Sequence, residues 1–128
     1  MPNGSKVVGF ERVFRVTVIV PSHSGIAERI TEAILKHDRL CYGNMNDQVA
    51  FESAIGGERF RPIEVDKSSD RRRSAVPSIE LSFTLPRGGS KDATHLREVL
   101  DAIVEVHPWE EPQIFVQEVL ATRTQKSA

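Results

Sequence analysis

The sequence predicts an α+β domain in which two helices cover one face of an antiparallel sheet. Three observations support this prediction. Apolar residues recur at every second position in two segments, each of these segments ends at a proline, and each is followed by an apolar stripe at helical spacing. The order strand, proline, helix therefore occurs twice, at Pro21 and again at Pro86, which indicates an internal structural repeat.

The first unit joins a strand over residues 14–21 to a helix over residues 25–38. In the strand, apolar residues at even positions alternate with Arg15 and Thr17, so the apolar side chains share one face. In the helix, the apolar residues follow a helical period. Acidic residues stand near its start and basic residues near its end, which suits the helix dipole.

The second unit joins a strand over residues 79–86 to a helix that ends at His107. The apolar residues of this strand again alternate with polar ones, and a glycine-rich turn leads into the helix. The helix must end at His107 because Pro108 pushes the residue before it out of the helical region.

Each unit is followed by a further strand. Alternating residues predict a strand over 49–55, and Gly56-Gly57 then offers a tight turn into a short strand over 58–61, which gives a hairpin in the first half. A last strand is expected over 114–119. Two βαβ units with both helices on one face of an antiparallel sheet form a ferredoxin-like split βαβ arrangement.

We expect one domain over residues 12–120, between a flexible N-terminus (1–11) and a polar tail (121–128). Within the domain, residues 64–77 are charged, rich in serine and without an apolar period, which predicts a mobile loop. Its Arg71-Arg72-Arg73 triplet could contact an anion. Because no aromatic residues are interleaved with these arginines, a solvated loop is the favoured interpretation.

The composition excludes several classes of function. Of 128 residues, 39% are hydrophobic and 27% are charged, which is enough to build a core without a metal or a disulfide. The net charge of −1 argues against a general binder of nucleic acids or membrane surfaces. Cys41 is the only cysteine, so a Cys-rich zinc site is excluded, and we expect it to be buried and unreactive. With no membrane-spanning run or signal-peptide core, we expect a cytoplasmic protein.

Residues 107–112, His-Pro-Trp-Glu-Glu-Pro, form the densest group of candidate binding residues. The two prolines stiffen this loop, which reduces the entropy lost when a ligand binds. His107 beside Glu110 and Glu111 could bind a divalent metal, with His107 and Glu110 as ligands, or act as an acid/base pair. The alternative is structural: Trp109 fills the end of the core or a subunit contact, and the glutamates face water. We favour the structural or interface interpretation over catalysis.

The stretch from His107 to Phe115 resembles the His-Pro-Tyr-Glu-Glu-Pro motif of the domain inserted in NIF3-like (YqfO-type) proteins, where the motif also joins a last helix to a last strand. A second stretch is similar to the Gly-Asn-Tyr…Phe…Gly-Thr…Phe-Arg-Pro pattern of that family. Its residues are Tyr42-Gly43-Asn44, Val49-Ala50-Phe51, Gly56-Gly57 and Phe60-Arg61-Pro62. The related CutA proteins carry a similar His-Pro-Tyr-Glu element on the PII-like version of the ferredoxin fold, and they are trimers.

The resemblance spans residues 12–120 and implies a PII/CutA-like domain that self-associates, with a trimer favoured. Trp109 stands where the family usually has tyrosine, a change that keeps an aromatic side chain with a polar group. Asn46-Asp47 replaces a more hydroxyl-rich stretch. Full-length NIF3-like proteins bind two metals through flanking domains, and this chain has about the size of the insert alone. Their hydrolase activity is therefore not carried over.

We expect a non-enzymatic, homo-oligomeric PII/CutA-like module that is regulatory or binds a small ligand or metal between subunits. The candidate interface residues are Ile19, Trp109, Phe115 and Val119. Three of them, Ile19, Phe115 and Val119, should lie on the sheet face opposite the helices. The alternative is a CutA-like protein that binds divalent metal through His107 and Glu110, and a metal-dependent hydrolase of the NIF3 type ranks lower. RNA binding would need aromatic residues on the central strands, where polar residues stand instead.

Overall fold

Eight elements follow one another along the chain in the computed structural model. They are β1 (Lys6–Pro21), α1 (Ile26–Leu35), β2 (Phe51–Ala54), β3 (Glu58–Phe60), β4 (Ser74–Val76), β5 (Ser78–Pro86), α2 (Thr94–Val106) and β6 (Ile114–Lys126). The structure describes residues 6–23, 25–43, 45–54, 56–61, 74–88 and 93–126. The Arg71-Arg72-Arg73 triplet and most of the loop expected over 64–77 lie outside these residues.

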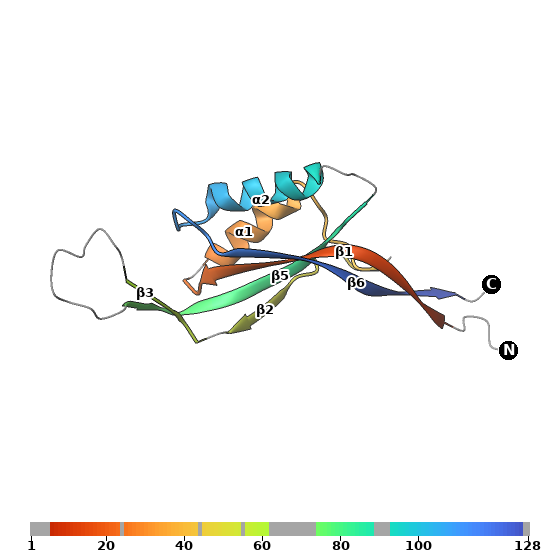
Figure 1. The fold of residues 1–128 in the computed structure, drawn as a ribbon, viewed down its shortest axis with the longest axis horizontal. Coiled ribbons are helices and arrows are strands. Elements are labelled where there is room, and N and C mark those ends of the chain that lie inside the picture. The colour runs from red at the N-terminus through yellow and green to blue at the C-terminus, as the bar shows by residue number, and fades with distance from the viewer. Residues whose placement is uncertain are drawn as a thin grey trace.

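Four strands form an antiparallel sheet in the order β2-β5-β1-β6. Both helices lie on the same face of this sheet, as Figure 1 shows. Because β5 lies between β1 and β2, each βαβ unit is split by a strand of the other. The predicted ferredoxin-like fold is confirmed. No helix in the described part of the chain is long and apolar enough to cross a membrane.

The core lies between the sheet and the two helices. Its fully buried residues come from every second position of the central strands and from one stripe of each helix. They include Val16, Val18, Val20, Ile30, Ile34, Leu81, Phe83, Leu85, Val99 and Ile103. The alternation predicted for the two central strands and the helical stripes therefore identified the core correctly. Burial of this apolar surface is the main stabilising contribution to the fold.

The first helix is shorter than predicted. It ends at Leu35, three residues before the predicted boundary at Asp38. The reason lies in the Asp38 side chain, whose Oδ1 accepts a hydrogen bond from the backbone N–H of Leu40 at 2.7 Å. Leu40 has a positive φ of 54° and is buried in the core. A local turn held by Asp38 thus replaces the last helical turn.

The two terminal segments differ from their prediction. β1 begins at Lys6 and β6 runs to Lys126, and the two strands pair throughout, from Lys6↔Lys126 to Val18↔Ile114. Of the expected flexible segment 1–11 and polar tail 121–128, the described residues 6–11 and 121–126 are therefore strand. Backbone hydrogen bonds between the two segments hold this ribbon, and such bonds do not require the apolar alternation that marks a core strand.

The prediction of a hairpin between residues 49–55 and 58–61 is also wrong. β3 does not fold back on β2 but pairs with β4 in a separate two-stranded sheet. Gly57 shows why a glycine is needed here: a Cβ at this position would lie 3.0 Å from the carbonyl oxygen of Val76. The glycine pair lets the chain pass close to β4 and continue outward, as Figure 1 shows.

Candidate functional site

The predicted site, the loop over residues 107–112, lies between α2 and β6. α2 ends at Val106, and His107 takes an extended conformation (φ −71°, ψ 137°), as the following proline requires. Its backbone N–H still donates to the carbonyl of Ile103 at 2.9 Å, which completes the last helical turn. Pro108 thus determines where the helix ends and fixes the backbone conformation from which the His107 side chain extends.

The His107 ring is almost buried, with 7% of the residue exposed. Its Nε2 lies 2.8 Å from the carbonyl oxygen of Ile19, and its Nδ1 lies 3.1 Å from the backbone nitrogen of Trp109. A carbonyl can only accept and an N–H can only donate, so the hydrogen is on Nε2 and Nδ1 is the acceptor. His107 therefore ties the loop to the central strand β1.

Of the other candidate residues of the loop, Trp109 contacts this histidine. The Trp109 ring is half-buried and lies 5.0 Å from the His107 ring, tilted by 52°. Glu110 and Glu111 are both exposed. The loop thus combines a buried histidine, a half-buried tryptophan packed against it and two exposed carboxylates. This arrangement agrees with the structural interpretation of the loop.

This geometry offers little to a metal ion. Both ring nitrogens of His107 are hydrogen-bonded within the chain, so neither has a lone pair directed at a ligand. Among the described residues, no group of three or more His, Cys, Asp or Glu side chains is placed to hold a metal ion. Metal binding by His107 and Glu110 stays a prediction, and it would require His107 to give up one of its hydrogen bonds.

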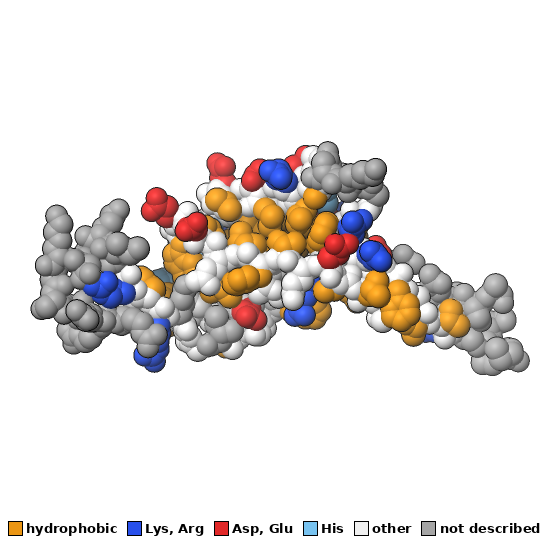
Figure 2. All heavy atoms as spheres, in the orientation of Figure 1, with side chains coloured by type: hydrophobic (Ala, Val, Ile, Leu, Met, Phe, Trp, Pro, Cys, Tyr) orange, Lys and Arg blue, Asp and Glu red, His pale blue; other side chains and the backbone are white. Residues whose placement is uncertain are grey.

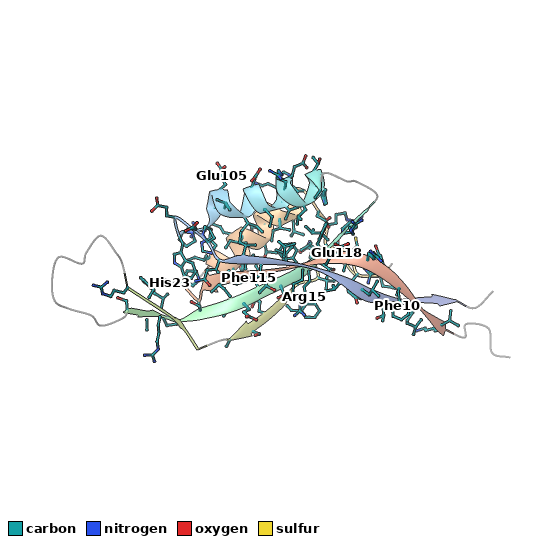
Figure 3. The ribbon with its side chains drawn as sticks, viewed as in Figure 1. Phe10, Arg15, His23, Glu105, Phe115 and Glu118 are labelled. Atoms are coloured by element: carbon teal, nitrogen blue, oxygen red, sulfur yellow. The ribbon has the colours of Figure 1, made fainter. Side chains whose placement is uncertain are left out.

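The sheet face opposite the helices carries a second candidate site. Cross-strand pairing places Phe51, Ser82, Thr17 and Phe115 in one row across all four strands. The two phenylalanines at the ends of the row are 61% and 56% exposed. In the middle, the hydroxyls of Thr17 and Ser82 are hydrogen-bonded at 3.1 Å. We call this surface the open face; Figure 3 shows Arg15 and Phe115, which belong to it.

Three of the predicted interface residues lie on the open face by their register. Phe115 is exposed, Val119 is half-buried, and Ile19 is buried despite facing away from the helices. The fourth, Trp109, lies in the loop at one end of the sheet. The sequence analysis did not identify Phe51 as an interface residue. The alternation in its segment predicts a strand but does not say that this strand pairs with β5.

A third group of side chains surrounds the loop between α1 and β2. Nε2 of His95 donates to Oδ2 of Asp38 at 2.7 Å and so joins this loop to the start of α2. The sequence analysis did not identify this contact, which joins residues 57 positions apart. A guanidinium nitrogen of Arg39 lies 3.1 Å from Oδ2 of Asp47. The hydrogen bond to this carboxylate raises the pKa of Arg39. Cys41 is exposed, so the expectation that it is buried is wrong.

Comparison with known proteins supports the fold. No family model matches the chain, and no curated protein does. Among solved structures, a Bacillus cereus protein related to NIF3 is similar to 91% of this chain, with a TM-score of 0.63 and 21% identity. CutA from Xylella fastidiosa matches 84% of the chain at a TM-score of 0.58 and 15% identity. CutA1 from Oryza sativa matches 85% at a TM-score of 0.57 and 10% identity.

The share of each neighbour that is covered differs. The chain spans 29% of the NIF3-related protein but 83% and 81% of the two CutA chains. At these identities the likeness shows the fold: a CutA-like domain that also occurs as part of a larger NIF3-related chain. The predicted resemblance to the NIF3-like insert and the CutA proteins is confirmed at this level.

Proposed function

We propose that this chain is a non-enzymatic module that self-associates through the open face of its sheet, as a trimer of the CutA type. The observation that carries the proposal is the row of residues across this face, with exposed Phe51 and Phe115 at its ends and a hydroxyl pair between them. Exposed aromatic side chains next to polar groups are typical of an interface. The likeness in fold to CutA proteins supports the same conclusion.

The charges of the open face are compatible with contact between identical copies. Arg15 and Glu80 both lie on this face, one row to either side of the Thr17–Ser82 pair. A face that carries one charge of each sign can meet a copy of itself with opposite charges adjacent. We expect a small ligand, where one is bound, to lie in a cleft between the associated subunits.

The test is the oligomeric state of a Phe115→Ser variant, measured by sedimentation velocity over a range of concentrations. Loss of this exposed aromatic side chain should weaken association by about tenfold or more. Val104→Ser is the matched control, because Val104 is an exposed apolar residue on α2, on the other side of the molecule from the open face. A wild-type chain that sediments as a monomer at all concentrations would refute the proposal.

The alternative function, divalent-metal binding by His107 and Glu110, has weaker support. Glu110 is exposed and follows the histidine in the same loop, but both ring nitrogens of His107 are occupied. Calorimetric titration with Zn²⁺ of the wild type and of a His107→Ala, Glu110→Ala variant decides the matter. Binding by the wild type that the variant lacks would favour this alternative, whereas equal or absent binding in both would reject it.

A further inference from the structure

The ends of β1 and β6 form a two-stranded arm that extends beyond the rest of the sheet. We define the arm as residues 6–12 and 120–126, which pair from Lys6↔Lys126 to Arg12↔Leu120. Pairing of β1 with β5 begins only at Val13, so the arm has no third strand. In Figure 1 it points away from the helices and from β2. A two-stranded ribbon is at best marginally stable alone in water, so a partner that covers it would stabilise it.

The two faces of the arm differ in their contacts. One face carries Glu11 and Arg123, which form an ion pair at 2.8 Å. The Arg123 guanidinium also lies over the ring of Tyr42, 4.4 Å from its centroid. This face is therefore partly covered by the chain between α1 and β2.

The other face of the arm is apolar and basic. Val8, Phe10 and Leu120 share it by their register and are between 61% and 70% exposed. Figure 2 shows apolar side chains along this part of the molecule, and Figure 3 shows Phe10 on the arm. Lys6 and Arg12 stand at alternate positions of the same face, and no acidic residue does. We call this surface the basic face of the arm.

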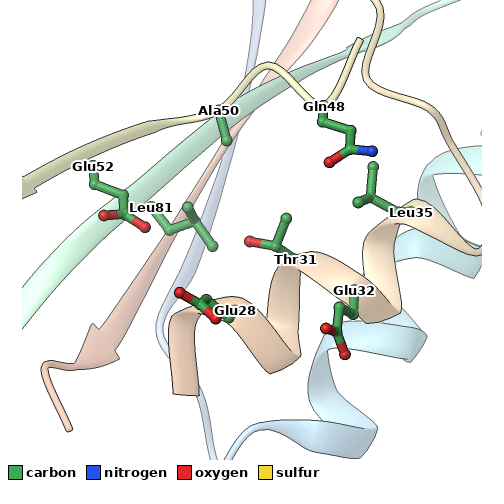
Figure 4. A pocket seen from close by; sticks show the side chains of 8 residues that line it. All are labelled: Glu28, Thr31, Glu32, Leu35, Gln48, Ala50, Glu52 and Leu81. Carbon is green, nitrogen blue, oxygen red and sulfur yellow. The ribbon is translucent and has the colours of Figure 1, made fainter. Parts of the chain in front are cut away.

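A pocket with the complementary character lies between α1 and β2. It has a volume of about 470 Å³, and Figure 4 shows the side chains that line it. Three carboxylates surround it, from Glu28, Glu32 and Glu52. Its apolar part comes from Leu35, Ala50 and Leu81. None of the described residues that line it is basic. We call it the acidic pocket.

We infer that the basic face of the arm docks into the acidic pocket of a second copy of this chain. Phe10 contacts the apolar part of the pocket, while Arg12 and Lys6 approach the carboxylates. The inference rests on the proposed self-association and adds a second contact to it. The arm points away from its own pocket, so the pocket that it enters belongs to another copy.

The charges also oppose the simplest alternative contact between copies. If two arms met face to face about a two-fold axis, Lys6 and Arg12 of each would approach the same cations of the other. Like charges brought together in this way oppose association. Arm-to-pocket contact is instead heterologous: each copy provides an arm to one neighbour and a pocket to another, and such contacts close into rings when the geometry allows.

A mixing experiment tests this pairing. Phe10→Glu alters the arm and leaves the pocket intact, whereas a Glu28→Lys, Glu32→Lys variant alters the pocket and leaves the arm intact. Each variant alone should associate about tenfold or more weakly than the wild type. An equimolar mixture should form one-to-one dimers, because one intact arm and one intact pocket remain. Sedimentation velocity on the full-length variants measures all three samples, and Val104→Glu is the control.

The outcomes separate this inference from the proposed function. One outcome overturns the inference while the proposed function stands. In it the wild type associates, Phe115→Ser weakens this association, and the arm and pocket variants associate as strongly as the wild type. If both variants are weakened but their mixture forms no dimer, the arm does not enter this pocket. If the wild type is monomeric, both fail. Should Phe10→Glu not fold, Arg12→Glu combined with Glu32→Arg tests the same contact, and restored association in the double variant is the expected result.

Discussion

The two faces of the sheet are built from alternate residues of the same strands, but they differ in what they contact. On β1, Val16 and Val18 are fully buried against the helices, while Arg15 and Thr17 lie on the open face. The covered face is apolar on the two central strands and carries Glu52 and Glu118 on the edge strands, whereas the open face combines hydroxyls and charges with exposed aromatic rings. The difference indicates that one face holds the fold together and that the other contributes little to stability and is available for association.

The largest expected effect compares one phenylalanine from each face. Phe83→Ala leaves a cavity in the core and should lower the free energy of unfolding by about 3–5 kcal/mol. Phe115→Ala removes an exposed ring and should change it by only about 0.5 kcal/mol. Urea denaturation at a concentration where the chain is monomeric measures both. Equal destabilisation by the two substitutions would contradict the division of roles between the faces.

A smaller effect is expected at the end of the sheet, where His107 holds the loop to β1. His107→Ala removes both ring hydrogen bonds and leaves the Ile19 carbonyl without this donor, which should cost about 2–3 kcal/mol in unfolding free energy. His23→Ala serves as the control, because His23 is exposed. Thermal unfolding followed by circular dichroism compares the two variants. If both lose the same stability, the His107 contacts do not stabilise the loop.

The polar contacts on the helix side should matter less. Asp38→Ala leaves the Leu40 N–H without its acceptor and breaks the contact with His95, at a cost of about 1–2 kcal/mol in unfolding free energy. Asp38→Asn keeps an oxygen for the Leu40 N–H and should retain more than half of this stability. Urea denaturation ranks the three proteins. An asparagine variant as unstable as the alanine variant would show that the contact with His95 dominates instead.

The smallest effect is expected for the hydroxyl pair on the open face. Thr17→Val keeps the shape of the side chain and removes its hydrogen bond to Ser82, which should cost about 0.5–1 kcal/mol. Chemical denaturation of the monomer gives the value. A loss above that of Asp38→Ala would mean that the open face contributes more to stability than its exposure indicates.

The sequence predicted the covered face well because local patterns report it. The alternation in β1 and β5 placed Val16, Phe83 and every second residue on either side of them on one face. Pro108 marked the end of α2. The candidate site was predicted only in part. The density of candidate binding residues in 107–112 pointed to the loop, and the resemblance supported it, but the partner of His107 is the Ile19 carbonyl, 88 positions away. No local pattern reports a contact at that distance along the chain.

By itself, then, the sequence determined the order of the four main strands and the two helices, the residues of the central strands and helices that face the core, and the point where α2 stops. These follow from side-chain periodicity and from the fixed backbone angles of proline, which act over a few residues. Only the tertiary structure decided the row from Phe51 to Phe115, the arm of β1 and β6, and the acidic pocket between α1 and β2. Each of these depends on which strands lie side by side, and strand pairing is set by the packing of distant segments.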